Sequence, residues 1–126
     1  MTDEHAEFFD SFCRDFREFD GNVVARRYAT PYVAATSDGE LLCFSTQQEI
    51  ARYFQGHLDR YKALGCTRCS YSNLEVVPLG QRYALATVTW QLCDAADKVL
   101  STWRESYNLR RIEGGMQIYA STDHVR

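Results

Sequence analysis

Glu105 is the carboxylate in this sequence whose setting could do chemistry. It lies in a run in which Trp103, Tyr107 and Leu109 alternate with polar residues, so it falls on the apolar face of a predicted strand. A carboxylate among aromatic rings is poorly hydrated, which raises its pKa, and such a group can donate or accept a proton near neutral pH. We predict that Glu105 is the acid/base group of a pocket. The alternative is a structural carboxylate that hydrogen-bonds to a tyrosine or a histidine.

Two histidines are the candidate partners of Glu105. If residues 114–115 form a two-residue turn, the flanking strands pair so that His124 lies opposite Glu105. A three-residue turn would place Asp123 there instead. His57 lies on the apolar face of a predicted helix and could approach the same pocket from above. The alternatives are that His57 is a packing or rim residue, and that His124 belongs to a frayed chain end.

Aromatic side chains are expected to form the walls of this pocket. A loop centred on residues 95–96 pairs Trp90 with Ser101 and Ala86 with Glu105, which gathers the apolar side chains on one face. The alternative is that these rings simply fill a core. The predicted pocket-lining residues are Phe12, Phe16, Tyr32, Tyr53, His57, Trp90, Trp103, Tyr107 and Ala120.

The five cysteines offer less chemistry than their number suggests. Cys66 and Cys69 form a Cys-x-x-Cys pair, but the pair opens a strand-like run, whereas a redox pair is activated at a helix N-terminus. A zinc site needs two further ligands at a suitable spacing, and the other cysteines are scattered singly. We therefore expect reduced, structural thiols, with no metal and no cofactor.

Periodicity and turn signals predict the elements that position these residues. The Thr46-to-Glu49 segment is a capping box, so a long helix begins there, and Gly65 ends it. Segregated helices and strands indicate an α+β fold in which helices cover one face of an antiparallel sheet. The other predicted elements are helices over 3–19 and 22–28, the second stopped by Pro31, a hairpin over 32–44, and strands over 66–79, 82–93, 98–112 and 116–124.

Composition limits the class of protein. The chain has 126 residues, 45% of them hydrophobic, which suits one domain over residues 1–126 with a packed core. Its net charge of −3 and the absence of a basic run argue against nucleic-acid binding. No apolar stretch reaches the roughly 20 residues that span a bilayer, and the acidic start does not resemble a signal peptide. We expect a cytoplasmic protein.

The order of elements and several segments resemble the nuclear transport factor 2-like superfamily, which includes ketosteroid isomerase-like and SnoaL-like families. The resemblance rests on the aromatic first helix that ends at residues 20–22, the 24–32 stretch, residues 38–41, the capped helix from Thr46, the strand at 86–90 and the ending at 114–118. It implies a cone-shaped domain in which a strongly curved antiparallel sheet wraps around a long helix, with two N-terminal helices. It also implies a pocket inside the cone and a homodimer that pairs through the outer sheet face.

The same resemblance implies roles for individual positions. Glu105 lies near the place where ketosteroid isomerases carry a protonated Asp in their oxyanion hole. Phe12 takes the place of their hole-forming tyrosine and lacks its hydroxyl, and Thr36 falls where they carry the general-base Asp, with Asp38 two residues later. These departures argue against steroid isomerase activity.

Two functions follow from these residues. In the first, the protein is a cofactor-free isomerase, cyclase or dehydratase that acts on a small apolar or aromatic molecule by proton transfer, with Glu105 as acid/base and His124 or His57 as its partner. In the second, it is a non-catalytic module for ligand binding or association. The missing tyrosine and aspartate of the isomerase pattern favour the second, and a buried glutamate opposite a histidine favours the first.

Overall fold

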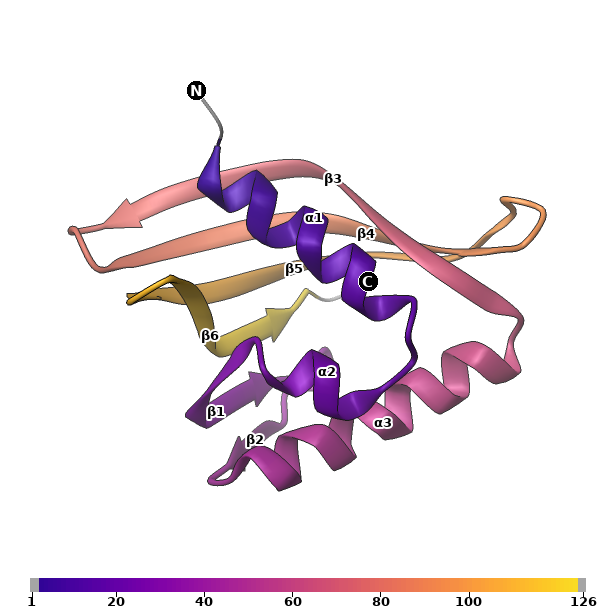
Figure 1. Cartoon of the computed structure of the whole chain (residues 1–126), viewed down its shortest axis with the longest axis horizontal. Coiled ribbons are helices and arrows are strands. Elements are labelled where there is room, and N and C mark those ends of the chain that lie inside the picture. The colour runs from indigo at the N-terminus through magenta and orange to yellow at the C-terminus, as the bar shows by residue number, and fades with distance from the viewer. Residues whose placement is uncertain (1–2, 125–126) are drawn as a thin grey trace.

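The computed structural model describes residues 3–124 and confirms the predicted order of elements (Figure 1). Two predicted helices are shorter than expected, and Pro31 lies inside a strand rather than at the end of a helix. The elements are α1 (Glu4–Phe16), α2 (Gly21–Ala25), β1 (Tyr28–Ala35), β2 (Leu41–Phe44), α3 (Gln47–Ala63), β3 (Cys66–Leu79), β4 (Tyr83–Asp94), β5 (Val99–Ile112) and β6 (Gly115–Asp123).

The helix ends follow the signals in the sequence. The Thr46 side chain accepts a hydrogen bond from the backbone of Glu49, and the Glu49 carboxylate accepts one from the backbone of Thr46, so the predicted capping box starts α3. The helix ends just before Gly65, whose φ of 92° suits a residue without a Cβ. Asp3 caps α1 with its side chain, which accepts from the backbone N–H of His5.

The strands form one curved, unclosed sheet in the order β2-β1-β6-β5-β4-β3. All neighbouring strands are antiparallel except β1 and β6, which are parallel. In Figure 1, α1 crosses the long strands β3 to β5, whereas α2 and α3 lie beside β1 and β2. This arrangement is the α+β cone predicted above. None of the helices within residues 3–124 is long and apolar enough to cross a membrane.

The β4–β5 register differs from the predicted one by two residues. Trp90 pairs with Trp103, not Ser101, and Val88 rather than Ala86 lies opposite Glu105. The cause is a register shift beside Cys93 and a turn that closes with the Asp94 backbone N–H bonded to the Lys98 carbonyl at 3.0 Å. Because the shift is even, each side chain stays on its predicted face.

The β5–β6 register differs in a way that changes the site. Asn108 pairs with Ala120 but Leu109 pairs with Ile118, so one extra residue of β6 forms a bulge between these pairs. Beyond the bulge every β6 side chain is turned to the other face. Asp123 therefore lies opposite Glu105, and the predicted His124–Glu105 pair is wrong.

Candidate functional site

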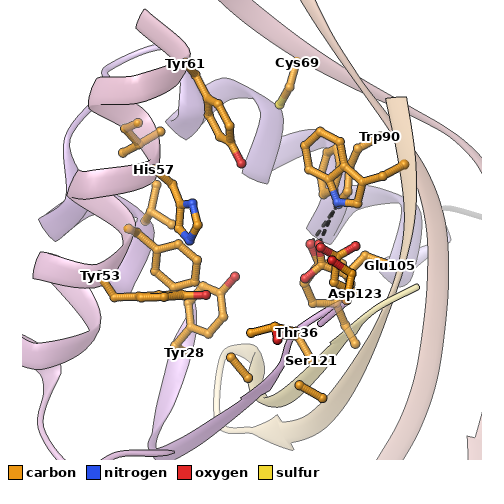
Figure 2. A pocket seen from close by; sticks show the side chains of 18 of the residues that line it. Tyr28, Thr36, Tyr53, His57, Tyr61, Cys69, Trp90, Glu105, Ser121 and Asp123 are labelled. Atoms are coloured by element: carbon orange, nitrogen blue, oxygen red, sulfur yellow. Dashed lines mark hydrogen bonds between the residues drawn. The ribbon is translucent and has the colours of Figure 1, made fainter. Parts of the chain in front are cut away.

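A cavity of about 390 Å³ lies between α3 and the concave face of the sheet. Figure 2 shows its two sides: Tyr53, His57 and Tyr61 of α3 lie across the space from Trp90 and Glu105 of the sheet. The β1–β2 connection contributes Thr36 and further polar side chains to the lining. A volume of this size is typical of pockets for small organic molecules.

Most of the predicted lining residues border this cavity. They are Phe12, Phe16, Tyr32, Tyr53, His57, Trp90, Trp103 and Tyr107. Ala120 does not border it, because the bulge in β6 pairs Ala120 with Asn108 on the outer face of the sheet. Ser121 and Asp123 take its place on the inner face.

Glu105 is held on the inner face by an indole. The Trp103 Nε1–H donates a hydrogen bond of 2.9 Å to Glu105 Oε1. Burial of the carboxyl and the negative charge of Asp123 raise the pKa of Glu105, and the hydrogen bonds from Trp103, Tyr107 and Ser121 lower it; the balance is a pKa of about 7. Glu105 keeps some accessible surface and borders the cavity, so a molecule inside the cavity could exchange a proton with it.

His57 faces Glu105 from the opposite wall (Figure 2). The Arg60 guanidinium donates to His57 Nδ1 at 2.6 Å, and because arginine is only a donor, Nδ1 must be the acceptor. The neutral ring therefore carries its proton on Nε2. Burial and the charge of Arg60 lower the pKa of His57, against a smaller opposite effect of Asp123, so the imidazole is neutral at neutral pH.

His124 lies outside the site. Its Nε2 is 2.8 Å from the Ser106 hydroxyl, and Ser106 pairs with Thr87 on the outer face of the sheet. The single-residue bulge in β6 is the physical reason, since it exchanges the faces of His124 and Asp123. His124 therefore cannot serve as the partner of Glu105.

Five tyrosines border the cavity, and four of them have a raised pKa. Burial raises the pKa of Tyr28, Tyr32 and Tyr107, and it also raises that of Tyr53, with the charge of Glu105 as a further cause. The Tyr32 hydroxyl lies 2.5 Å from the Ser121 hydroxyl, and Trp90 Nε1 donates to the Tyr107 hydroxyl at 2.8 Å. These hydroxyls remain protonated at neutral pH and are able to donate hydrogen bonds.

Sequence reasoning missed part of the lining. Tyr28 and Glu40 border the cavity although they were not predicted to do so. Tyr61 borders the cavity as well, and it continues the helical stripe of His57. Thr36 and Asp38, the positions compared with the isomerase base, both border the cavity, and neither is hydrogen-bonded to Glu105 in the described residues.

The family model described as "NTF2-like protein (DUF6841)" matches residues 3–125. The chain belongs to this NTF2-like family. The predicted superfamily is thereby confirmed, while the family description assigns no activity. No curated protein matches the sequence significantly.

Solved structures share the fold of this NTF2-like chain at low sequence identity. Aln2 from a Streptomyces species has a TM-score of 0.77 at 15% identity, over 97% of this chain and 88% of that one. A putative calcium/calmodulin dependent protein kinase II association domain from Xanthomonas campestris has a TM-score of 0.70 at 20% identity, over 98% and 86%. A domain of unknown function with a cystatin-like fold from Nostoc punctiforme has a TM-score of 0.75 at 16% identity, over 100% and 79%. Similarity at this level establishes the fold alone.

Proposed function

We propose that this NTF2-like protein is a small-molecule enzyme in which Glu105 transfers a proton to or from a substrate inside the cone, without a cofactor. The observation that carries the proposal is the Glu105 carboxyl, anchored through one oxygen by Trp103 at the border of an aromatic-walled cavity. A carboxyl whose pKa lies near 7 is divided between its acid and base forms at neutral pH, which suits both directions of transfer.

The wall opposite Glu105 supplies hydrogen-bond donors. The neutral His57 carries its proton on Nε2, and the Tyr53 hydroxyl keeps its own because burial raises its pKa. Donors at this position would stabilise negative charge on a substrate oxygen while Glu105 removes a proton from carbon. Isomerisation, cyclisation and dehydration all contain such a step.

Steroid isomerisation is not the reaction that we propose. Phe12 has no hydroxyl to complete an oxyanion hole, and Thr36 cannot act as the general-base carboxylate. The reactive group here is Glu105 itself, with Asp123 next to it across the strand pair. The roles are therefore distributed differently from those of ketosteroid isomerases.

Hydrogen–deuterium exchange at carbon tests this proposal without knowledge of the complete reaction. Ring-bearing ketones that bind, as judged by NMR shifts of the two indole N–H groups, are incubated with the protein in D₂O, and loss of the α-proton signal is followed. We expect exchange that is at least tenfold faster with the wild type than with Glu105→Gln. Equal rates for a ketone that binds both proteins would contradict the proposal.

We also propose that two copies pair through the outer face of the sheet. Three apolar side chains on this face keep much of their surface exposed: Val77 at 53%, Tyr83 at 48% and Leu79 at 44%. Burial of such a patch favours association. Light scattering should give the mass of a dimer, and Val77→Glu combined with Tyr83→Glu should give that of a monomer. A monomeric wild type would refute the pairing.

A further inference from the structure

The charged groups that border the cavity are all of one sign. Two carboxylates, Glu105 and Asp123, lie on the sheet wall, and Asp38 and Glu40 come from the β1–β2 connection. Within the part of the chain that the structure describes, no lysine or arginine borders the cavity. A pocket that selects an anionic substrate would need the opposite arrangement.

Aromatic rings make up most of the remaining wall. Rings from α1, β1, α3, β4 and β5 surround the space, so an occupant meets π faces or edges from several elements. Tryptophan and tyrosine rings attract cations through their quadrupole, and the attraction is strongest where water is excluded. The tryptophan and tyrosine residues concerned are Tyr28, Tyr32, Tyr53, Tyr61, Trp90, Trp103 and Tyr107.

We propose that the substrate of this cavity is an organic cation, namely an ammonium group attached to an apolar or aromatic body. The ammonium group would lie against Glu105 and Asp123, and the body would lie among the rings of α1 and α3. This inference deepens the function proposed above and rests on it, since it names the class of molecule on which Glu105 acts. It narrows the small apolar or aromatic ligand expected from the sequence to one that carries a positive charge.

The basic groups near the cavity do not prevent the binding of a cation. His57 is neutral at neutral pH, because burial and Arg60 lower its pKa. Arg60 does not border the cavity, and its guanidinium is directed at His57 Nδ1. Arg27 does not border the cavity either: its guanidinium pairs with Asp15 at 2.7 Å and lies over the ring of Phe12, 5.3 Å from the ring centroid.

Binding of a cation must be linked to the protonation of Glu105. The titratable groups around this carboxyl are Asp123 on β6, Tyr107 on β5, Tyr28 and Tyr32 on β1, Tyr53 and His57 on α3, and Cys69 on β3. The tyrosines and His57 are neutral at pH 7, whereas the pKa of Glu105 is about 7, so the charge of Glu105 changes near that pH. A bound ammonium ion favours the ionised carboxylate, so affinity should rise as pH increases through about 7.

A pair of probes of nearly equal shape separates charge from shape. (4-Hydroxyphenyl)trimethylammonium carries the cation, and 4-tert-butylphenol replaces the nitrogen by carbon. The only two tryptophans of the chain both border the cavity, so their fluorescence reports binding of either probe. At pH 8 we expect the cation to bind at least tenfold more tightly than the phenol. At pH 5.5 this preference should fall by several-fold, because Glu105 is then protonated.

Variants show whether the cavity carboxylates cause the preference. Glu105→Gln and Asp123→Asn should each weaken binding of the cation several-fold and leave the affinity for the phenol unchanged. Unchanged binding of the phenol also shows that the variant is folded. Glu113→Gln, in the exposed turn before β6, removes the same charge outside the cavity and should change neither affinity.

The outcomes separate this inference from the proposed function. If the phenol binds the wild type as tightly as the cation or more tightly, the organic-cation inference is overturned, while proton transfer by Glu105 on a neutral substrate still stands. If neither probe binds the wild type, the organic-cation inference and the proposed function both lose their ligand-binding site. A preference for the cation that survives in Glu105→Gln and in Asp123→Asn would also overturn the inference.

Discussion

At the level of single residues, the protonation of Glu105 is set by opposing neighbours. Burial and the Asp123 charge favour the neutral acid, whereas hydrogen bonds from Trp103, Tyr107 and Ser121 favour the carboxylate. The balance places the pKa at about 7. A change at any one of these neighbours should therefore move the pKa in a direction that is known in advance.

Asp123→Asn should lower the pKa of Glu105. The substitution keeps the shape of the side chain but removes the negative charge that disfavours ionisation of Glu105. NMR titration of the Glu105 carboxyl carbon measures the change. Asp38→Asn is the control, because Asp38 borders the same cavity but is not among the principal causes of the shift, and it should move the pKa less. An unchanged or raised pKa in Asp123→Asn would contradict the assigned cause.

Arg60→Gln should raise the pKa of His57. The guanidinium charge lowers this pKa and its N–H group holds Nδ1 as an acceptor, so removing it makes the imidazolium easier to form. Proton NMR of the His57 ring across pH 5 to 8 gives the value. Arg52→Gln removes the same charge from an exposed position of the same helix and should have a smaller effect. If the two substitutions raised the pKa of His57 equally, Arg60 would act only through the overall charge of the protein.

At the level of elements, the position of α3 depends on its close approach to α2. The Gly21 backbone N–H donates to Gln55 Oε1 at 2.6 Å, and a Cβ at Gly21 would lie 2.3 Å from the Ala51 carbonyl oxygen. Only a residue without a side chain permits this contact. The helix that carries Tyr53 and His57 is thus fixed against the α2 backbone.

Gly21→Ala should lower the free energy of unfolding by roughly 1–3 kcal/mol, because the added methyl group forces two backbones apart. Urea denaturation measures this loss. Gly56→Ala is the matched control on α3: its Cβ would meet no atom closer than 3.7 Å, so the higher helix propensity of alanine should stabilise the protein by about 0.5–1 kcal/mol. If Gly21→Ala were neutral, the packing of α2 on α3 would be looser than described.

The elements themselves could be predicted because their signals are local. The capping box at Thr46, the glycine at position 65 and the alternation in the long strands each act over a few residues, and all three are confirmed. The bulge in β6 could not be predicted, because no residue type there demands it and it depends on pairing with β5. One extra residue therefore decided that Asp123, not His124, borders the cavity.

At the level of the whole molecule, the raised pKa of Glu105 makes folding depend on pH. In the unfolded chain a glutamate titrates near about 4.3, and in the folded protein Glu105 titrates at about 7. Between these values the folded state binds more protons than the unfolded state, so the free energy of unfolding falls as pH rises. Above the folded pKa the loss is complete.

Glu105→Gln should abolish this loss, since glutamine does not ionise but can still accept the Trp103 hydrogen bond. We expect the variant to be more stable than the wild type by roughly 3 kcal/mol at pH 8 and by much less at pH 5. Urea denaturation at the two pH values measures both differences. A difference that does not change with pH would show that Glu105 titrates normally in the folded protein.

The most direct test of the account is the pKa of Glu105 in the unmodified protein. The carboxyl carbon resonance, assigned by its loss in Glu105→Gln, is followed by NMR from pH 4 to pH 9. The account predicts a midpoint near 7. A midpoint at the ordinary value of about 4.3 would contradict it, because Glu105 would then be a fully ionised carboxylate at neutral pH, unable to act as the acid of this site.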